Sequence, residues 1–221
     1  MNKELQKRIL TSIIIVPISF FFLIQQTLFF TFFLSIFFLV TSYEWIKMSK
    51  TGFLKIIGIF YLFFAFILTF LLRENFSIGL FIFVLIICVF TDLGGYIFGK
   101  IFKGPKLTKI SPKKTYTGAL GGFILSLVAA FIFSKYTAIG AATNENLSQW
   151  IGMSFNKIYY LFVIVISLIS QIGDLIISYF KRLAKVKDTG NFLPGHGGLL
   201  DRIDGILFAI PFSYLLLTYI S

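Results

Sequence analysis

The residues best suited to chemistry in this sequence are three aspartates around one polar segment. Asp201 and Asp204 follow the segment PGHGG at 194–198, and Asp174 lies near the end of the apolar run before it. The segment holds too much Gly and Pro to be helical, whereas Asp201 and Asp204, three positions apart, share one face of the helix expected after it. Two predicted helices therefore present carboxylates to one loop. Hard oxygen ligands suit Mg²⁺ or Mn²⁺, so the pattern indicates metal-assisted chemistry on a phosphate substrate.

Cations follow these carboxylates along the chain. Ser178 lies four positions after Asp174, and Lys181 and Arg182 lie three and four positions after Ser178. All four side chains share one face if the helix continues past the membrane surface. The region's basic residues would neutralise phosphates, the arginines by bidentate contacts and the lysines as point charges. These residues are Lys181, Arg182, Lys185, Lys187 and Arg202.

Carboxylates inside apolar runs have two interpretations. Such a group is costly unless it faces a cavity, a cation or a partner. Asp92 and Asp174 are both in this position, so each is either functional or a structural Asp bonded to a neighbouring helix or Lys. The acidic residues other than the five aspartates are expected to be solvated surface charges in termini or loops. They are Glu4, Glu44, Glu74 and Glu145.

The only histidine, His196, lies between two glycines of the polar segment. A role as general acid or base, or as a donor to a phosphate, is expected there, and a purely structural hydrogen bond is the alternative. The segment matches neither a Walker A motif nor a dinucleotide fingerprint, and no strand precedes it.

A second basic segment runs from Lys100 to Gly118 and carries six lysines. Taken alone, it is typical of a cytoplasmic loop that contacts anionic lipid headgroups. Beside a metal site, four of its residues become candidate ligands of a nucleotide triphosphate. These four are Ser111, Lys113, Lys114 and Thr115.

Long apolar runs must position these residues. The runs show no dyad alternation and are long enough to cross the hydrocarbon core or nearly so, which predicts an all-α polytopic membrane protein of about seven helices. The expected spans are 9–25, 27–43, 56–72, 77–98, 118–134, 158–177 and 204–220. The run 77–98 could be interrupted at Gly94 and Gly95. The first run is expected to be an uncleaved helix rather than a secretory signal.

The basic residues predict the orientation. With a cytoplasmic N-terminus, all of the 20 basic residues except Arg73, Lys135 and Lys157 fall on the inner side. This distribution agrees with the positive-inside rule and with an odd number of spans.

Composition narrows the class of protein. Of the 221 residues, 57% are hydrophobic, 13% are charged and 30 are Phe, which is more apolar surface than a soluble core of this length could bury. The net charge of +11 lies in short stretches between apolar runs, so nucleic-acid binding is not expected. The single cysteine, Cys88, allows neither an intrachain disulfide nor a cysteine metal site.

The segment SYFKRLAKVKDTGNFLPGHGGLLDRID, from Ser178 to Asp204, resembles the signature of phosphatidate cytidylyltransferases, also called CDP-diacylglycerol synthases. The resemblance extends through SQIGDL at 170–175 and ISPKKT at 110–115, and more loosely through TDLGGYIFGK at 91–100. The sequence departs from the family at Tyr116 and Thr117, where Trp-Glu is usual, and at Gly95, where Ala is common. The fixed signature positions present are Ser178, Lys181, Arg182, Lys187, Asp188, His196, Gly197, Gly198, Asp201, Arg202 and Asp204.

The resemblance implies transfer of the cytidylyl group of CTP to phosphatidate, dependent on Mg²⁺, at the cytoplasmic face of the inner membrane. The matching family positions imply that Asp174 and Asp201 hold the metal, while Asp204 and Asp188 orient the site or bind a second cation. Lys181 and Arg182 would bind phosphates, and His196 would donate to a phosphate or relay a proton. Substrate contacts are expected from Ser178, Lys187, Asp188 and Arg202, and from Ser111, Lys113, Lys114 and Thr115.

The resemblance also implies a homodimer, and the basic loop from Lys100 to Gly118 is expected to contact anionic lipids. It covers the C-terminal half, so the chain is divided into N-terminal membrane helices, 1–76, and a catalytic membrane region, 77–221. No residue of the first part can be matched to the family. Three other functions stay open. They are a CTP-dependent lipid kinase, a cytidylyltransferase that acts on another lipid phosphate, and an ion-coupled transporter that uses Asp92 and Asp174.

Overall fold

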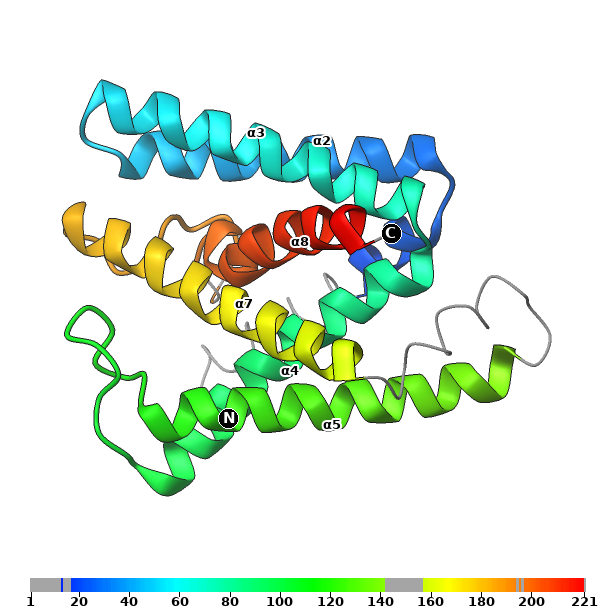
Figure 1. Cartoon of the computed structure of the whole chain (residues 1–221). Helices are drawn as coiled ribbons and strands as arrows, with labels where there is room; N and C mark the ends of the chain where they lie inside the picture. Colours follow the sequence, from blue (N-terminus) through cyan, green and yellow to red (C-terminus); the bar gives the residue numbers. More distant parts are fainter. Residues whose placement is uncertain (1–12, 14–16, 142–156, 194, 196, 221) are drawn as a thin grey trace.

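The chain folds as a bundle of long helices. The computed structural model describes residues 13, 17–141, 157–193, 195 and 197–220. Residues 17–24 are helical, and longer helices follow them (Figure 1). They are α2 (Thr27–Met48), α3 (Gly52–Asn75), α4 (Ile78–Phe102), α5 (Tyr116–Ala141), α7 (Lys157–Leu183) and α8 (Leu200–Ile220).

Helix α8 lies at the centre of this arrangement. It contacts α2, α3, α4 and α7, while α5 packs on α4 and α7 (Figure 1). Helices α2 and α3 form an antiparallel pair along one side of α8. The connections 49–51 and 103–115 and the described residues 184–193 all lie at the same end of the bundle in Figure 1. The two basic segments predicted to meet a phosphate substrate therefore share one end of the fold.

The predicted all-α fold of a multi-pass membrane protein is confirmed. Among the described residues, five helices are long and apolar enough to cross a membrane: α2, α3, α4, the part Tyr116–Lys135 of α5, and the part Ile158–Leu183 of α7. They contain five of the seven predicted spans. Of the first predicted span, 9–25, residues 13 and 17–25 are described, and 17–24 are helical, but this helix is not one of the five. The last predicted span, 204–220, lies in α8, which is not one of the five either. The only extended pairing in the described part of the chain is two isolated bridges, Lys106 with Thr115 and Leu193 with Gly197.

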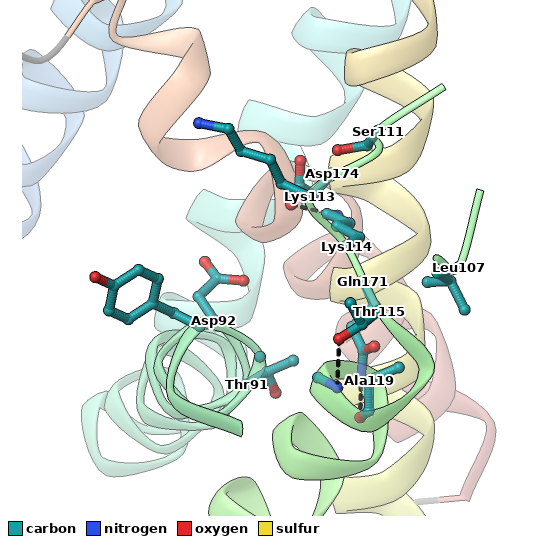
Figure 2. A pocket seen from close by; sticks show the side chains of 13 residues that line it. Thr91, Asp92, Leu107, Ser111, Lys113, Lys114, Thr115, Ala119, Gln171 and Asp174 are labelled. Atoms are coloured by element: carbon teal, nitrogen blue, oxygen red, sulfur yellow. Dashed lines mark hydrogen bonds and ion pairs between the residues drawn. The ribbon is translucent and has the colours of Figure 1, made fainter. Parts of the chain in front are cut away.

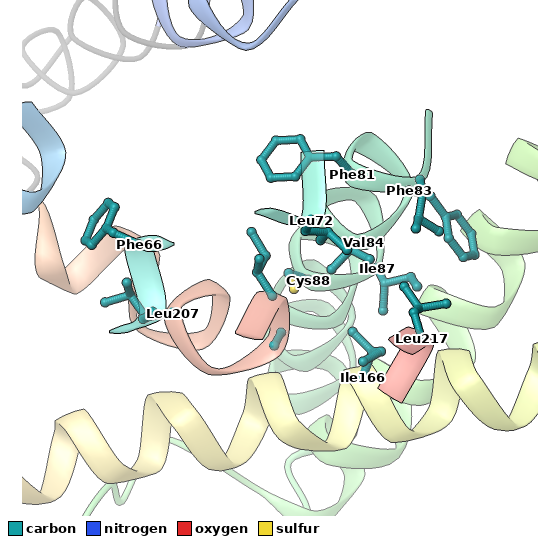
Figure 3. Packing of buried hydrophobic residues seen from close by; sticks show 14 of the residues in the cluster. Phe66, Leu72, Phe81, Phe83, Val84, Ile87, Cys88, Ile166, Leu207 and Leu217 are labelled. Atoms are coloured by element: carbon teal, nitrogen blue, oxygen red, sulfur yellow. The ribbon is translucent and has the colours of Figure 1, made fainter. Parts of the chain in front are cut away.

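Side chains from α3, α4, α7 and α8 form the centre of the hydrophobic core (Figure 3). Leu72, Val84, Ile87 and Ile166 are completely buried there. The outer faces of the same helices expose large hydrophobic side chains, as expected for helices that pack against lipid. The core thus fixes the relative positions of α4, α7 and α8. These helices carry Asp92, Asp174, Asp201 and Asp204.

Glycines bring α4 and α5 into backbone contact. A Cβ atom on Gly94 would lie 2.3 Å from the carbonyl oxygen of Gly121, and one on Gly118 would lie 2.7 Å from that of Gly95. Small residues at helix interfaces in membranes allow this close approach. The interruption suggested at Gly94 and Gly95 is wrong: α4 continues through both residues, since backbone packing between the helices offsets the low helix propensity of Gly.

Replacing Gly94 by Ala is expected to destabilise the protein, because the added methyl would meet the backbone of α5. Overpacking of this kind costs about 1–3 kcal/mol of unfolding free energy. Gly95→Ala is the matched control, since its methyl would meet nothing closer than 3.8 Å. Thermal unfolding of the two variants in one detergent measures the difference. Equal midpoints would show that α4 and α5 are not in backbone contact at Gly94.

Candidate active site

A polar pocket of about 320 Å³ opens where α4, α5 and α7 meet the segment 103–115 (Figure 2). Helix α4 contributes Asp92, and α7 contributes Gln171 and Asp174. The residues predicted to bind a nucleotide triphosphate all line the pocket: Ser111, Lys113, Lys114 and Thr115. The structure therefore brings this group together with Asp174, and nucleotide binding by these residues stays a prediction.

The segment 103–115 is shaped by its own backbone. Leu107 N donates to Lys114 O at 2.8 Å, and Lys114 N donates to Ser111 O at 3.0 Å. These bonds fold the segment back on itself and direct Lys114 into the pocket. Arg182 joins the segment to α7, because its Nε donates to Ile110 O at 3.4 Å.

The hydroxyl of Thr115 has a structural partner at the start of α5. It accepts a hydrogen bond from Gly118 N at 3.0 Å, as an N-cap does. Thr117, which stands where the family usually has an acid, hydrogen bonds with the Thr115 hydroxyl at 3.1 Å and accepts from Gly104 N at 3.3 Å. Both threonines thus close the base of the segment, and Thr115 reaches the pocket as part of this cap.

Asp174 lies among charged groups from three elements. Its Oδ2 forms an ion pair with Lys114, and its Oδ1 accepts from Ser178 Oγ at 3.3 Å. The carboxylate also interacts electrostatically with Asp92 and with Asp204. Carboxylates that repel one another favour a nearby cation, and Lys114 supplies one at Asp174.

Asp201 organises the signature segment. Its Oδ1 pairs with Lys181 Nζ at 2.8 Å, and its Oδ2 accepts from Thr189 N at 2.8 Å and from Gly198 N at 3.0 Å. The pair is nearly buried, with 11% of the Lys181 side chain and 8% of the Asp201 side chain exposed. Gly197 has a φ of +87°, a value that L side chains rarely adopt, and it turns the segment towards Asp201.

The other predicted site residues have varied surroundings. Asp204 is buried and accepts from the N–H of Gly205 at 2.9 Å. Lys187, Asp188 and Arg202 are exposed at the same end of the bundle. His196 lies outside the described residues.

The described residues include no group of three or more His, Cys, Asp or Glu side chains that could hold a metal ion. Mg²⁺, however, is commonly bound by one or two carboxylates together with substrate phosphates and waters. Asp174 fits this pattern, because it lines an open pocket, 27% of its side chain is exposed, and two more carboxylates lie within electrostatic reach. The donor set therefore fits a Mg²⁺ ion that shares its ligands with phosphates.

Glu44 is the residue that the sequence analysis missed. A solvated surface charge was predicted, but the prediction is wrong: Glu44 is 2% exposed, in the last turns of α2. Its Oε1 accepts from Leu199 N at 2.9 Å, and its Oε2 accepts from Leu200 N at 2.8 Å. The one signal in the sequence was its position in a helix whose only other charged residue is Lys47, since an unpaired carboxylate among apolar residues is costly.

Comparisons with known proteins find phosphatidate cytidylyltransferases of several bacteria to be similar to this chain. A phosphatidate cytidylyltransferase of Staphylococcus saprophyticus is 37% identical over 140 residues, which are 63% of this chain and 49% of that protein. That of Bacillus subtilis is 41% identical over 133 residues, or 59% of this chain and 44% of that protein. That of Haemophilus influenzae is 39% identical over 137 residues, or 61% of this chain and 44% of that protein.

The chain spans about half the length of the curated relatives it matches. The family model described as "Cytidylyltransferase family" matches residues 50–220, from the start of α3 to the end of α8. This match includes the polar pocket and the whole signature segment, and on this basis the chain belongs to the cytidylyltransferase family.

Proposed function

We propose that the chain transfers the cytidylyl group of CTP to phosphatidate and releases CDP-diacylglycerol and pyrophosphate. The observation that supports the proposal most directly is the presence of two ion pairs, Lys114–Asp174 and Lys181–Asp201. They link the segment 103–115, α7 and α8 at one end of the bundle, so the candidate nucleotide ligands adjoin the signature segment. Family membership and the name shared by the relatives support the same reaction.

In this reaction a phosphate oxygen of phosphatidate attacks the α-phosphorus of CTP. The new P–O bond forms as the bond to the bridging oxygen breaks, and pyrophosphate leaves with the electron pair. Positioning and charge stabilisation supply most of the catalysis in phosphoryl transfer. Lys113, Lys114, Lys181 and Arg182 would bind the phosphates, and the hydroxyls of Ser111 and Ser178 would orient them.

The remaining predicted roles complete the proposed site. Asp174 and Asp201 would hold Mg²⁺, which neutralises phosphate charge when it is bound. Asp204 and Asp188 would orient the site or bind a second cation. His196 would donate to a phosphate or relay a proton, and Lys187 and Arg202 would contact substrate phosphates.

The proposed setting is the cytoplasmic face of the inner membrane, with seven spans and a cytoplasmic N-terminus. The exposed apolar helix surfaces leave the acyl chains of phosphatidate in the bilayer, next to a site at the end of the bundle. The exposed lysines of 103–115 would meet anionic headgroups. A homodimer, and the division into 1–76 and 77–221, belong to the same proposal.

Labelled CTP tests the proposed reaction. The purified protein in detergent is incubated with α-labelled CTP, Mg²⁺ and phosphatidate, and the lipid is extracted into organic solvent. Label in the lipid phase that requires both phosphatidate and metal is the expected result. Transfer of a γ-label instead would identify a lipid kinase, and transfer of neither label would leave the transporter to be tested by ion flux in vesicles.

Replacing Lys114 by Met is expected to raise the KM for CTP at least about tenfold, because a charge-assisted phosphate contact contributes about 1.5–3 kcal/mol. Lys109→Met is the matched control: Lys109 is an exposed lysine of the same segment that does not line the pocket. Initial rates against CTP concentration measure both variants. Equal KM values would mean that the lysines act only through the overall charge of the segment.

A further inference from the structure

Glu44 is joined to the signature segment although 145 residues separate it from Thr189 in the sequence. Besides its bonds from Leu199 N and Leu200 N, its Oε2 accepts from Thr189 Oγ1 at 3.1 Å. All three donors are neutral. They satisfy a buried carboxylate at the N-terminus of α8, where the helix dipole also favours negative charge.

Glu44 and Asp201 hold the same segment from two sides. Thr189 donates its backbone N–H to Asp201 and its hydroxyl to Glu44. Gly198 N donates to Asp201, and the next residue, Leu199, donates its N–H to Glu44. The two carboxylates thus accept hydrogen bonds from the same residue, Thr189, and from the neighbouring residues Gly198 and Leu199. The position of Asp201 therefore depends on the bonds that Glu44 makes.

The glycines of the signature leave space for Glu44. A Cβ atom on Gly198 would lie 2.6 Å from Glu44 Oε2 and 2.1 Å from Thr189 Oγ1. One on Gly190 would lie 2.8 Å from Glu44 Oε1. Neither glycine has a positive φ among the described backbone angles, so close packing against Glu44 is what requires them.

The end of α2 is fixed independently of this segment. Trp45 Nε1 donates to Leu54 O at 3.0 Å, and its ring meets the ring of Phe180 edge to face at 5.0 Å between centroids. A Cβ atom on Gly58 would lie 1.8 Å from this indole. Helices α3 and α7 therefore hold the backbone beside Glu44, which makes it a rigid support.

We infer that Glu44 is a positioning residue for the reaction: it holds Thr189, Leu199 and Leu200 so that Asp201 and Lys181 keep their place in the site. The inference rests on the proposed function, and it places one essential group in the N-terminal region, for which the signature gives no role. Glu44 touches no reacting atom. It acts through Thr189, Leu199 and Leu200 on the geometry around Asp201.

Glu44→Gln tests the inference with two readouts. The amide keeps the size of the side chain but cannot accept at both ends, so one buried N–H loses its acceptor. A displacement of about 1 Å in a catalytic group can cost on the order of 10²-fold in rate. We expect kcat to fall about 30-fold or more, while the KM for CTP stays within about threefold because the segment 103–115 is untouched. Glu74→Gln is the matched control. Glu74 is a carboxylate in the last turn of α3, whereas Glu44 lies near the connection between α2 and the first turn of α3.

The second readout reports the segment itself. Phe192 is 59% exposed and Cys88 is 1% exposed, so a spin label attaches at Phe192→Cys without removal of the native cysteine. Its mobility should increase in Glu44→Gln and not in Glu74→Gln. This measurement needs no turnover, so it decides whether Glu44 holds the segment even if the protein transfers no cytidylyl group.

Two results would overturn the inference: unchanged label mobility in Glu44→Gln, or increased mobility with kcat within twofold of the parent. If Glu44→Gln does not fold, Thr189→Val replaces it, since this change removes one of the three donors at nearly constant volume. A several-fold loss of kcat with a more mobile label supports the inference. If kcat and label mobility in Thr189→Val both equal those of the parent protein, the inference is rejected.

Discussion

Turnover is expected to fall at least about 10³-fold when Asp201 is replaced by Asn, while the protein stays folded. The amide oxygen can keep the two bonds from Thr189 N and Gly198 N. The amide NH₂ must then face Lys181 Nζ in place of the carboxylate oxygen that now pairs with it at 2.8 Å. The variant therefore loses the negative charge and the ion pair but retains the contacts that fold the segment.

The assay is lipid-extractable label from α-labelled CTP, and the fold is checked by gel filtration and thermal unfolding in detergent. Lys181→Gln and the double variant complete a double-mutant cycle. Because the two side chains are paired, the double variant should lose little more than Asp201→Asn alone. Residual activity above about a tenth of the parent would remove Asp201 from the groups that act on the substrate.

The grouping of polar side chains near the end of α7 was predictable because it depends on spacing that is local in the sequence. Residues four apart on one helix, such as Asp174 and Ser178, must share a face, and the structure places them in contact. The apolar runs were equally informative, since five of them coincide with helices of membrane-spanning length. Lipid and backbone hydrogen bonding impose these features whatever the tertiary contacts.

The contacts that depend on distant segments were not predictable. Glu44 lies in a helix with no motif around it, and two of its three donors are backbone N–H groups, which leave no trace in the sequence. Gly94 was equally ambiguous, because a glycine in an apolar run can mark either a break or a close helix contact. Only the position of α5 resolves this question.

Asp174→Asn is expected to lower kcat by at least about 10³-fold and to raise the Mg²⁺ concentration that gives half of maximal activity by at least about tenfold. The carboxylate lines the pocket, holds Lys114 in an ion pair and interacts with two further carboxylates. An amide is a weaker ligand for a hard cation and cannot hold Lys114 by charge. Activity measured against Mg²⁺ concentration, after treatment with a chelator, gives both quantities.

Asp92→Asn is the matched comparison, because Asp92 lines the same pocket from α4. We expect this variant to lose less than about tenfold in kcat and to keep the Mg²⁺ requirement of the parent, since Asp92 would shape the field around Asp174 without binding the ion. A larger shift of the Mg²⁺ requirement in Asp92→Asn than in Asp174→Asn would assign the metal to α4. An unchanged requirement in both variants would mean that the ion is held by the phosphates and by other groups of the site.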